Sequence, residues 1–365
     1  MRYCAFSNRW KFLNCEFFID YPIKRGIFFT QELSSQVSKA LEPHVYFSRI
    51  LFSFSTKKSR SLVECINLKI RSGTYVDILD GITVCAVLPN LSYPQWTFYR
   101  NEFQNRQPNQ APIKIAVPEN ITFSCDQQTY VFREMSLTLK EWIAHIKRIL
   151  HSPIIDTLSF ANDEGLFDVG SIANAVGEVR DVAFISPGTE EQHMEKLKLF
   201  LLNRGIFFDN NVWQEKKRTA NVLIQNYDSF SLSVSIFGDT LSNIALDDLL
   251  LMNCKWNYVE RAKFTSGDMN RFLKLWTRRR GCRLEHIIVH SQDRLDKAAV
   301  FKGIPYQKLD PDRERQFKAS TDNQHIWSSA GEYEIKRRDG TRATIYIGNS
   351  CLEMYVWHDY CIVEE

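Results

Sequence analysis

The sequence predicts a mixed α/β fold of the α+β class, in which a small helical module precedes an irregular strand–helix domain with terminal hairpins. Three observations lead to this prediction. Apolar residues recur at helical spacing in several segments, which indicates helices with one buried side. Short runs with the spacing L-x-x-L-x-L recur through the second half, as in leucine-rich repeats. Two Asp-Gly pairs between apolar runs predict hairpins.

Length, charge and cysteine usage limit the classes of protein that fit. The chain has 365 residues, enough for two or three domains, and a formal net charge of +3, too small to imply nucleic acid by itself. Its nine cysteines form no C-x-x-C pair, and several lie in apolar runs, which predicts small buried side chains in a reducing compartment. No uncharged apolar run approaches the ~20 residues of a membrane span. We expect a soluble protein of the cytoplasm or nucleus.

The first predicted module is helical and covers residues 30–66, after an N-terminal segment, residues 1–29, that shows no clear periodicity. Thr30 is a candidate N-cap for a first helix, and Pro43 ends it because proline disfavours helix in the preceding residue. A second helix follows at once. Its apolar residues fall at i, i+3, i+4 and i+7: Phe47, Ile50, Leu51 and Phe54.

Residues 67–135 form a predicted β-rich connecting region. Asp80-Gly81 lies between two apolar runs and predicts a hairpin. The stretch 93–111 is rich in Asn and Gln and contains proline, which predicts a surface loop. Short strands are expected around 113–117 and 129–132.

The remaining domain, residues 136–365, begins with a predicted helix over Thr138–His151. Another helix is expected over Glu190–Asn203, closed near Gly205. Segments with the L-x-x-L-x-L spacing, which predict strands, start at residues 155, 179, 227, 246 and 284. Successive starts are therefore 24, 48, 19 and 38 residues apart. A regular repeat protein would keep one period, so we expect an irregular array whose strand–helix units bury their apolar faces against neighbours.

The segment from Ile244 to His290 is the clearest unit of this domain. Leu246, Leu249 and Leu251 predict a short strand, with Cys254 where the chain turns away. A helix capped by Thr265 and Asp268 follows and ends at Gly281. Its apolar stripe is Met269, Phe272, Leu273 and Trp276. The next strand contains Leu284, Ile287 and Val289, and two strands separated by one helix imply a parallel pair.

Two further elements close the chain. Asp339-Gly340 lies between Tyr333–Ile335 and Ala343–Ile347, which predicts a second hairpin. Alternating apolar residues over Leu352–Trp357 predict a final strand.

We find no sequence motif that indicates an enzymatic reaction. The phosphate-binding glycine motifs, the nucleophile-elbow motif and the H-E-x-x-H zinc motif are absent. His286 and His290 lie four apart, but on a strand and without a third ligand nearby. Asp247 and Asp248 are expected to be solvated turn residues rather than a catalytic pair. We therefore expect no enzyme, no catalytic residue, no cofactor and no metal.

Several segments resemble a known family. Leu51–Val63 resembles the second half of an F-box, and Asp268–Val289 resembles the F-box-associated domain of the type 2 family that is expanded in nematodes. The hairpin Ile335–Ile345 and the strand Leu352–Trp357 resemble the tail of the same family. The resemblance covers the chain from about residue 30 to its end. It departs from the family at its N-terminal end, where Met1–Phe29 precede the first helix and the family's Leu-Pro signature is absent.

The resemblance implies a substrate-receptor subunit of a cullin-type (SCF) ubiquitin ligase. The F-box of such proteins binds a Skp-type adaptor, and the remaining domain holds a protein target. Carried over by position, the residues that would dock the adaptor or support that docking are Leu41, Pro43, Phe47, Ile50, Leu51 and Phe54.

Two alternatives remain open. The first is a stand-alone protein-interaction module without adaptor binding. The second is a nucleic-acid binder that uses three basic clusters, Lys57–Arg60, Lys216–Arg218 and Arg278–Arg280. The first cluster has no interleaved stacking aromatics, and we expect a solvated helix face there. The last lies where cations suit the carboxyl end of a helix, or it forms a basic rim for an acidic target segment.

Overall fold

The structure is a computed structural model. The chain divides into two compact units, residues 1–180 (unit 1) and 181–365 (unit 2). The residues that the structure describes are 44–54, 57–66, 68, 70, 72–88, 92–99, 111–125, 128–133, 136–161, 166–186, 188–200, 204–212, 220–233, 241–279, 281–310, 315–320, 326–329 and 332–362.

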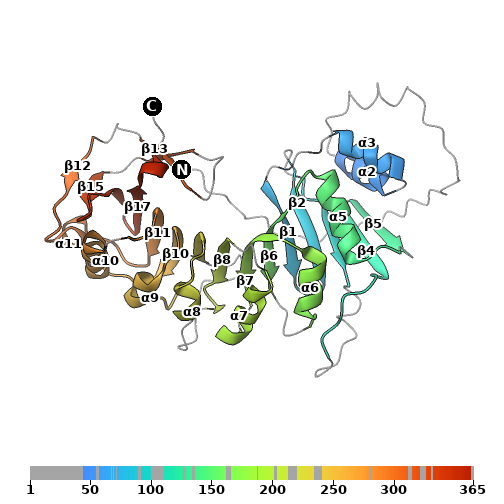
Figure 1. Cartoon of the computed structure of the whole chain (residues 1–365), viewed down its shortest axis with the longest axis horizontal. Helices are drawn as coiled ribbons and strands as arrows, with labels where there is room; N and C mark the ends of the chain where they lie inside the picture. Colours follow the sequence, from blue (N-terminus) through green and yellow to red (C-terminus); the bar gives the residue numbers. More distant parts are fainter. Residues whose placement is uncertain are drawn as a thin grey trace. The chain divides into compact units, whose positions relative to one another are not determined.

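Unit 1 contains a sheet with the strand order β6-β1-β2-β3-β4-β5 (Figure 1). Strands β1 to β5 pair antiparallel in sequence order, whereas β6 pairs parallel to β1. The hairpin predicted at Asp80-Gly81 is confirmed, with Ile78 opposite Ile82. The strands are β1 (Ser72–Ile78), β2 (Ile82–Val87), β3 (Gln95–Phe98), β4 (Asn120–Cys125), β5 (Gln128–Arg133) and β6 (Ile155–Phe160).

The best-defined helix of unit 1 is α5, and its prediction is confirmed. Thr138 caps its amino end through a capping box with Glu141, and Trp142 lies on its buried side. The first helix predicted after Thr30 lies outside the described residues. The helices are α2 (His44–Ser53), α3 (Lys57–Ile66), α5 (Leu139–Ile149) and α6 (Val169–Val176).

Two sequence predictions in unit 1 are wrong. Part of the stretch 93–111 is the strand β3, which lies between β2 and β4 and whose Trp96 and Phe98 side chains are buried. Those two aromatic residues outweigh the polar composition around them. The strand expected over 113–117 is only an isolated bridge between Ile113 and Phe167, and the regular strand β4 begins later.

Unit 2 contains five parallel strands followed by an antiparallel extension (Figure 1). The parallel order is β7-β8-β9-β10-β11, and β17, β16, β15 and β12 then pair antiparallel. The predicted second hairpin and final strand are β15–β16 and β17. The strands are β7 (Val179–Phe184, across the unit boundary), β8 (Gly205–Asp209), β9 (Ser229–Ser233), β10 (Trp256–Ala262), β11 (His286–Ser291), β12 (Gln307–Lys308), β15 (Tyr333–Lys336), β16 (Arg342–Ile347) and β17 (Cys351–Trp357); β13 (Arg315–Lys318) and β14 (Ile326–Ser329) form a separate hairpin.

The central helix of unit 2, α10, matches its prediction closely. Thr265 caps it through a capping box with Asp268, and Trp276 and the rest of the apolar stripe are buried. Gly281 has a φ of 65°, the left-handed conformation that glycine adopts readily after a helix. The helices are α7 (Glu190–Lys198), α8 (Ala220–Leu223), α9 (Leu246–Leu251), α10 (Ser266–Arg278), α11 (Lys297–Val300) and the 3-10 helix η2 (Asp359–Cys361).

The strand predicted over Leu246–Cys254 is wrong, because these leucines form the helix α9. The Asp248 carboxylate accepts a hydrogen bond of 2.8 Å from the backbone N–H of Ala245, which stabilises the first turn of a helix. Asp248 is therefore buried and is not the expected solvated turn residue. The strand begins instead at Trp256, so the parallel strand–helix–strand unit is β10–α10–β11.

Candidate protein-interaction surface

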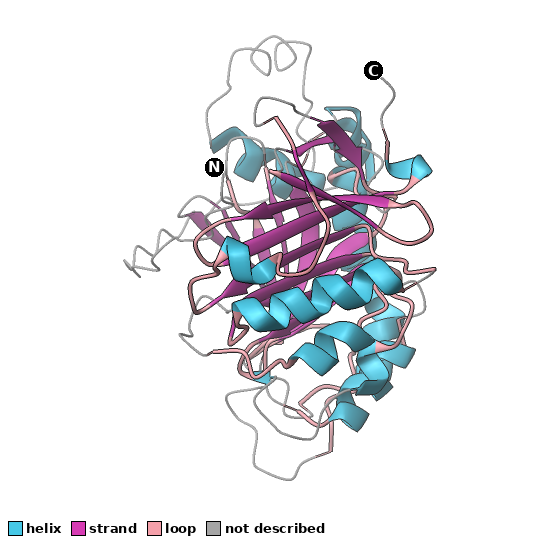
Figure 2. Ribbon diagram, turned by 90° about the vertical axis from the view of Figure 1, so that its left-hand side faces the viewer, coloured by secondary structure: helices cyan, strands magenta, loops and turns pink. Residues whose placement is uncertain are grey.

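The two faces of the parallel strands in unit 2 are covered differently. Asn257 of β10 and Ile287 of β11 line a cavity together with residues of α9 and α10, so these side chains face the helices. Figures 1 and 2 show the helices on one side of these strands. Because successive side chains alternate between faces, the neighbours of Asn257 and Ile287 point to the opposite side.

On that opposite side, four side chains lie at one level across four strands. The register pairs Phe207 with Ser231, Ser231 with Tyr258, and Tyr258 with Ile288. We call these four residues the open row. All four are partly exposed. Parallel strands are usually covered on both faces, so a partly exposed aromatic and aliphatic row is a candidate contact surface.

Beside the open row, His286 and β17 form a hydrogen-bonded aromatic group. The His286 ring stacks on Tyr355 with 4.3 Å between ring centroids, and His286 Nε2 lies 2.9 Å from Glu353 Oε1. The Tyr355 hydroxyl donates to the same oxygen at 2.5 Å. Burial alone would raise the pKa of Glu353, but the hydrogen bonds from His286 and Tyr355 lower it below its ordinary value. A carboxylate is therefore held beside this face of the sheet.

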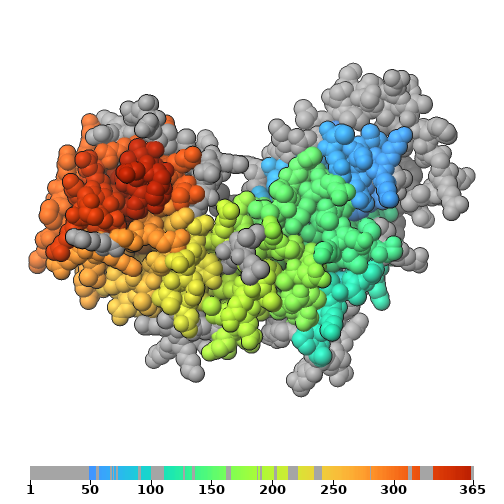
Figure 3. Space-filling view, in the orientation of Figure 1, coloured from blue at the N-terminus to red at the C-terminus, as the bar shows by residue number. Residues whose placement is uncertain are grey.

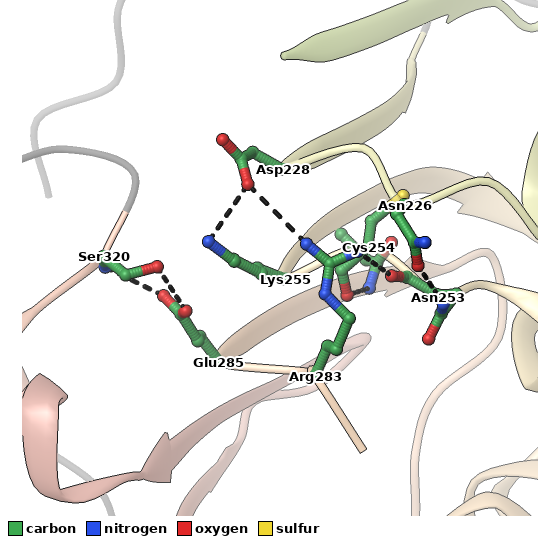
Figure 4. A network of polar contacts seen from close by, with 9 residues as sticks. Asn226, Asp228, Asn253, Cys254, Lys255, Arg283, Glu285 and Ser320 are labelled. Carbon is green, nitrogen blue, oxygen red and sulfur yellow. Dashed lines mark hydrogen bonds and ion pairs between the residues drawn. The ribbon is translucent and has the colours of Figure 1, made fainter. Parts of the chain in front are cut away.

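Charged side chains lie at the amino ends of the neighbouring strands β9, β10 and β11 (Figure 4). Asp228, Lys255 and Glu285 each directly precede one of these strands. The Lys255 N–H donates to the Asp228 carbonyl at 3.1 Å, and the Glu285 N–H donates to the Lys255 carbonyl at 2.8 Å. This backbone stagger places the side chains side by side, with Lys255 Nζ 3.1 Å and Arg283 3.8 Å from Asp228 Oδ1. The ion pairs fix the edge of the sheet.

Glu285 connects this edge to the chain after β13. It is fully buried and accepts hydrogen bonds from the Ser320 backbone N–H at 2.9 Å and from the Ser320 hydroxyl at 2.5 Å (Figure 4). Phe317 of β13 packs against Trp357 of β17, and both belong to one cluster of buried apolar residues. The β13 hairpin is thus anchored by both a buried carboxylate and an aromatic contact, and sequence patterns gave no sign of either.

The residues carried over for adaptor docking lie in unit 1, as far as they are described. Leu41 and Pro43 lie outside the described residues, and Phe47 belongs to α2. Ile50 is fully buried, whereas Leu51 and Phe54 are partly exposed. Ile50 therefore belongs to the core, whereas Leu51 and Phe54 keep accessible surface.

Sequence reasoning missed His145 of α5, which holds α2 in place. The Phe54 ring stacks on the His145 ring at 4.0 Å, and Ser53 Oγ lies 2.8 Å from His145 Nε2. Burial, together with the smaller effects of the positive charges of Arg60 and Arg148, lowers the pKa of His145 to about 3. His145 is neutral at pH 7. A histidine at an inward position of an amphipathic helix was the available signal.

The basic cluster of α3 is mostly solvated, as expected. Lys57 and Lys58 are exposed, whereas Arg60 is partly buried. Glu64 ties α3 to α5, since its backbone carbonyl lies 2.8 Å from His151 Nε2 and its carboxylate 3.6 Å from Arg148 Nε. The cluster Lys216–Arg218 lies outside the described residues.

The two histidines considered as metal ligands have aromatic neighbours. His290 shares a face with His286, as predicted, and its ring centroid lies 5.7 Å from that of Tyr258. In the described part of the chain, no group of three or more candidate ligands is arranged to hold a metal ion. Cys85 and Cys254 are buried, as predicted, and burial raises the pKa of Cys254 to about 12.

Comparison with known proteins gives one match. A family model described as F-box associated matches residues 219–289, which run from α8 through β9, α9, β10 and α10 into β11. The described residues of this range are coloured yellow to orange in Figure 3. The chain therefore carries an F-box-associated region. No curated protein and no solved structure matches. No described helix combines the length and apolar character that crossing a bilayer requires.

Proposed function

We propose that this protein is a substrate-receptor subunit of a cullin-type (SCF) ubiquitin ligase. It binds a Skp-type adaptor through an F-box-like module at residues 30–66 and a protein target through its C-terminal domain. One observation carries the proposal: the F-box-associated match over residues 219–289 includes three of the four strands of the open row. Such a receptor acts by raising the effective concentration of its target near the ligase, without chemistry of its own.

The adaptor contact is assigned to the helical pair α2 and α3. Phe47 and Leu51 lie one helical turn apart, so both fall on one side of α2. Leu51 is partly exposed, while Ile50 is buried and the Phe54 ring packs against Trp142 of α5. The contact therefore depends on Leu51 and Phe47, with Leu41 and Pro43 preceding them in the chain.

The target contact is assigned to the open row. Phe207, Tyr258 and Ile288 provide aromatic and aliphatic area, and Ser231 provides a hydrogen-bonding group between them. Buried aromatic and aliphatic anchors supply most of the binding energy in protein interfaces. The row lies on a rigid sheet, which fixes its geometry before any target binds.

The test is capture of a purified Skp-type adaptor by the full chain. The double variant Phe47→Asp, Leu51→Asp should lose capture, because two charges would be placed in an apolar contact. Leu199→Asp is the matched control, since this exposed leucine belongs to unit 2. Circular dichroism checks that each variant is folded. Unchanged capture by a folded double variant would remove the adaptor assignment, and no capture by the wild type would favour a stand-alone interaction module.

A further inference from the structure

The level of the open row continues onto the next two strands, β17 and β16. Ile288 pairs with Glu353, and Glu353 in turn pairs with Tyr346. Directly paired residues of neighbouring strands point to the same face, so the Glu353 side chain lies between Ile288 and Tyr346 on the face of the open row. Tyr346 is 39% exposed, and the Glu353 side chain is 25% exposed. A partner that covers the open row as far as β11 therefore reaches this carboxylate.

One oxygen of the Glu353 carboxylate is open to a partner. Oε1 takes both contacts described above, with His286 and with the Tyr355 hydroxyl. Among the described residues, no hydrogen bond reaches Oε2, and no lysine or arginine lies within ion-pair distance of Glu353. Because Oε2 is not one of the buried side-chain atoms without a partner, it keeps contact with solvent. Although burial raises the pKa of Glu353, the hydrogen bonds to Oε1 lower it below its ordinary value, so the carboxylate is charged at pH 7.

Covering this carboxylate has an energetic consequence that selects the partner. A charge that loses its contact with water is strongly destabilised unless an opposite charge pairs with it. An acidic partner would bring like charges together, and a wholly apolar partner would leave Oε2 unpaired. A lysine or arginine satisfies the site, because its charged head pairs with Oε2 while its aliphatic stem packs along Ile288. The ring of the neighbouring Tyr346 attracts a cation that approaches its face.

We propose that Glu353 gives the target contact its specificity by pairing with a lysine or arginine of the bound segment. This inference rests on the proposed role of the open row as the target contact. An aromatic or aliphatic side chain near that cation packs on Tyr258, which lies two strands from Glu353. Two strand spacings are about 10 Å, a distance that an extended segment crossing the strands covers in about three residues. The basic and apolar residues of the target are therefore two or three positions apart.

The first test selects peptides from a random library of short peptides displayed on phage, with the purified full chain as bait. Peptides selected on the wild type should be enriched in lysine or arginine two or three residues from an aromatic or aliphatic residue. Selection on Glu353→Gln should keep the apolar preference and lose the basic one, because the amide carries no charge. Asp247→Asn is the matched control, since it removes an exposed carboxylate on α9 and should retain both preferences.

The second test measures the pairing directly, by fluorescence anisotropy with one of the selected basic peptides. The same peptide with glutamine in place of its lysine or arginine serves as the comparison. Glu353→Gln should weaken binding of the basic peptide by about tenfold and have little effect on the glutamine peptide. A general loss of structure would weaken both peptides equally, so the double-mutant cycle isolates the contribution of the pair.

Ile288→Asp distinguishes a failure of this inference from a failure of the open row. It should abolish binding of both peptides. If it does so while Glu353→Gln weakens both peptides equally, the open row stands and the role of Glu353 is overturned. If both peptides bind Ile288→Asp as they bind the wild type, the open row is not their site and both proposals fail. A selection that returns no peptide, or peptides without enrichment in lysine and arginine, also overturns the role of Glu353.

Discussion

At the residue scale, Trp276 is the largest side chain on the buried face of α10. It packs under α10 against the sheet, and the Arg337 guanidinium carbon lies 5.5 Å from its ring centroid. Trp276→Ala should lower the free energy of unfolding by about 3–5 kcal/mol, because a large buried ring leaves a cavity. Urea denaturation measures the change. Leu275→Ala on the same helix is the control, and an equal loss there would contradict the buried position of Trp276.

His145 gives a pH dependence whose sign follows from its burial. Burial, with smaller effects of Arg60 and Arg148, lowers its pKa from 6.5 to about 3, so between these values the unfolded chain binds a proton that the folded chain does not. Stability should therefore fall as pH drops below about 6.5, and the fall should continue to about pH 3. His145→Gln removes the titrating group, and its free energy of unfolding should decline less steeply over the same interval in urea titrations.

The variant Ser53→Ala tests whether burial or the hydrogen bond with Ser53 is responsible for the lowered pKa of His145. The substitution removes the hydroxyl 2.8 Å from His145 Nε2 but leaves the ring buried against Phe54. Since burial is the larger cause of the lowered pKa, the steep decline should persist in Ser53→Ala. Identical slopes for wild type and His145→Gln would show that this histidine does not govern acid stability.

At the element scale, α9 shows where a sequence pattern stops being informative. The spacing L-x-x-L-x-L fits a strand edge, but six residues with leucines at both ends also fit a short helix. The carboxylate of Asp248 decides between them by capping the helix from its third position. Helices with long one-sided stripes, such as α5 and α10, were predicted well because their periodicity extends over three turns.

Strand β8 was missed for a different reason. Gly205 suggested the end of the preceding helix, whereas it begins a strand in the middle of the parallel sheet. A Cβ at this position would meet Asp181 Oδ1 and Ser229 Oγ on the two neighbouring strands. Glycine is therefore present because of side chains far along the sequence. The open row depends on the same cross-strand register, so its four residues could not have been grouped from sequence alone.

The cap of α9 can be tested directly. Asp248→Ala should lower the free energy of unfolding by about 1 kcal/mol, because the Ala245 N–H loses its acceptor at the helix start. Thermal or urea denaturation is sufficient to detect this. Asp247→Ala is the matched control, since its neighbouring carboxylate is exposed, and the change there should stay within about 0.5 kcal/mol. A larger effect for Asp247 than for Asp248 would exclude the capping role.

At the scale of the whole molecule, the two proposed contacts belong to different compact units. The adaptor residues lie on α2 in unit 1, and the open row lies on β8–β11 in unit 2. A substitution at Leu51 or Ile288 changes a partly exposed position within one unit, so we expect the other unit to stay folded. A receptor built this way has two binding activities that mutations separate, whereas a single composite surface would lose both together.

This separation yields the final prediction. Ile288→Asp places a charge in the open row and should remove the proteins that co-purify with the chain as targets, while adaptor capture stays at the wild-type level. The double variant Phe47→Asp, Leu51→Asp should do the reverse. Ile224→Asp is the control in unit 2, because this exposed isoleucine follows α8 outside the open row. Quantitative mass spectrometry of purified complexes compares the variants. If Ile288→Asp reduced adaptor and target capture equally while the protein stayed folded, the two contacts would not be independent, and the assignment of the target to the open row would fail.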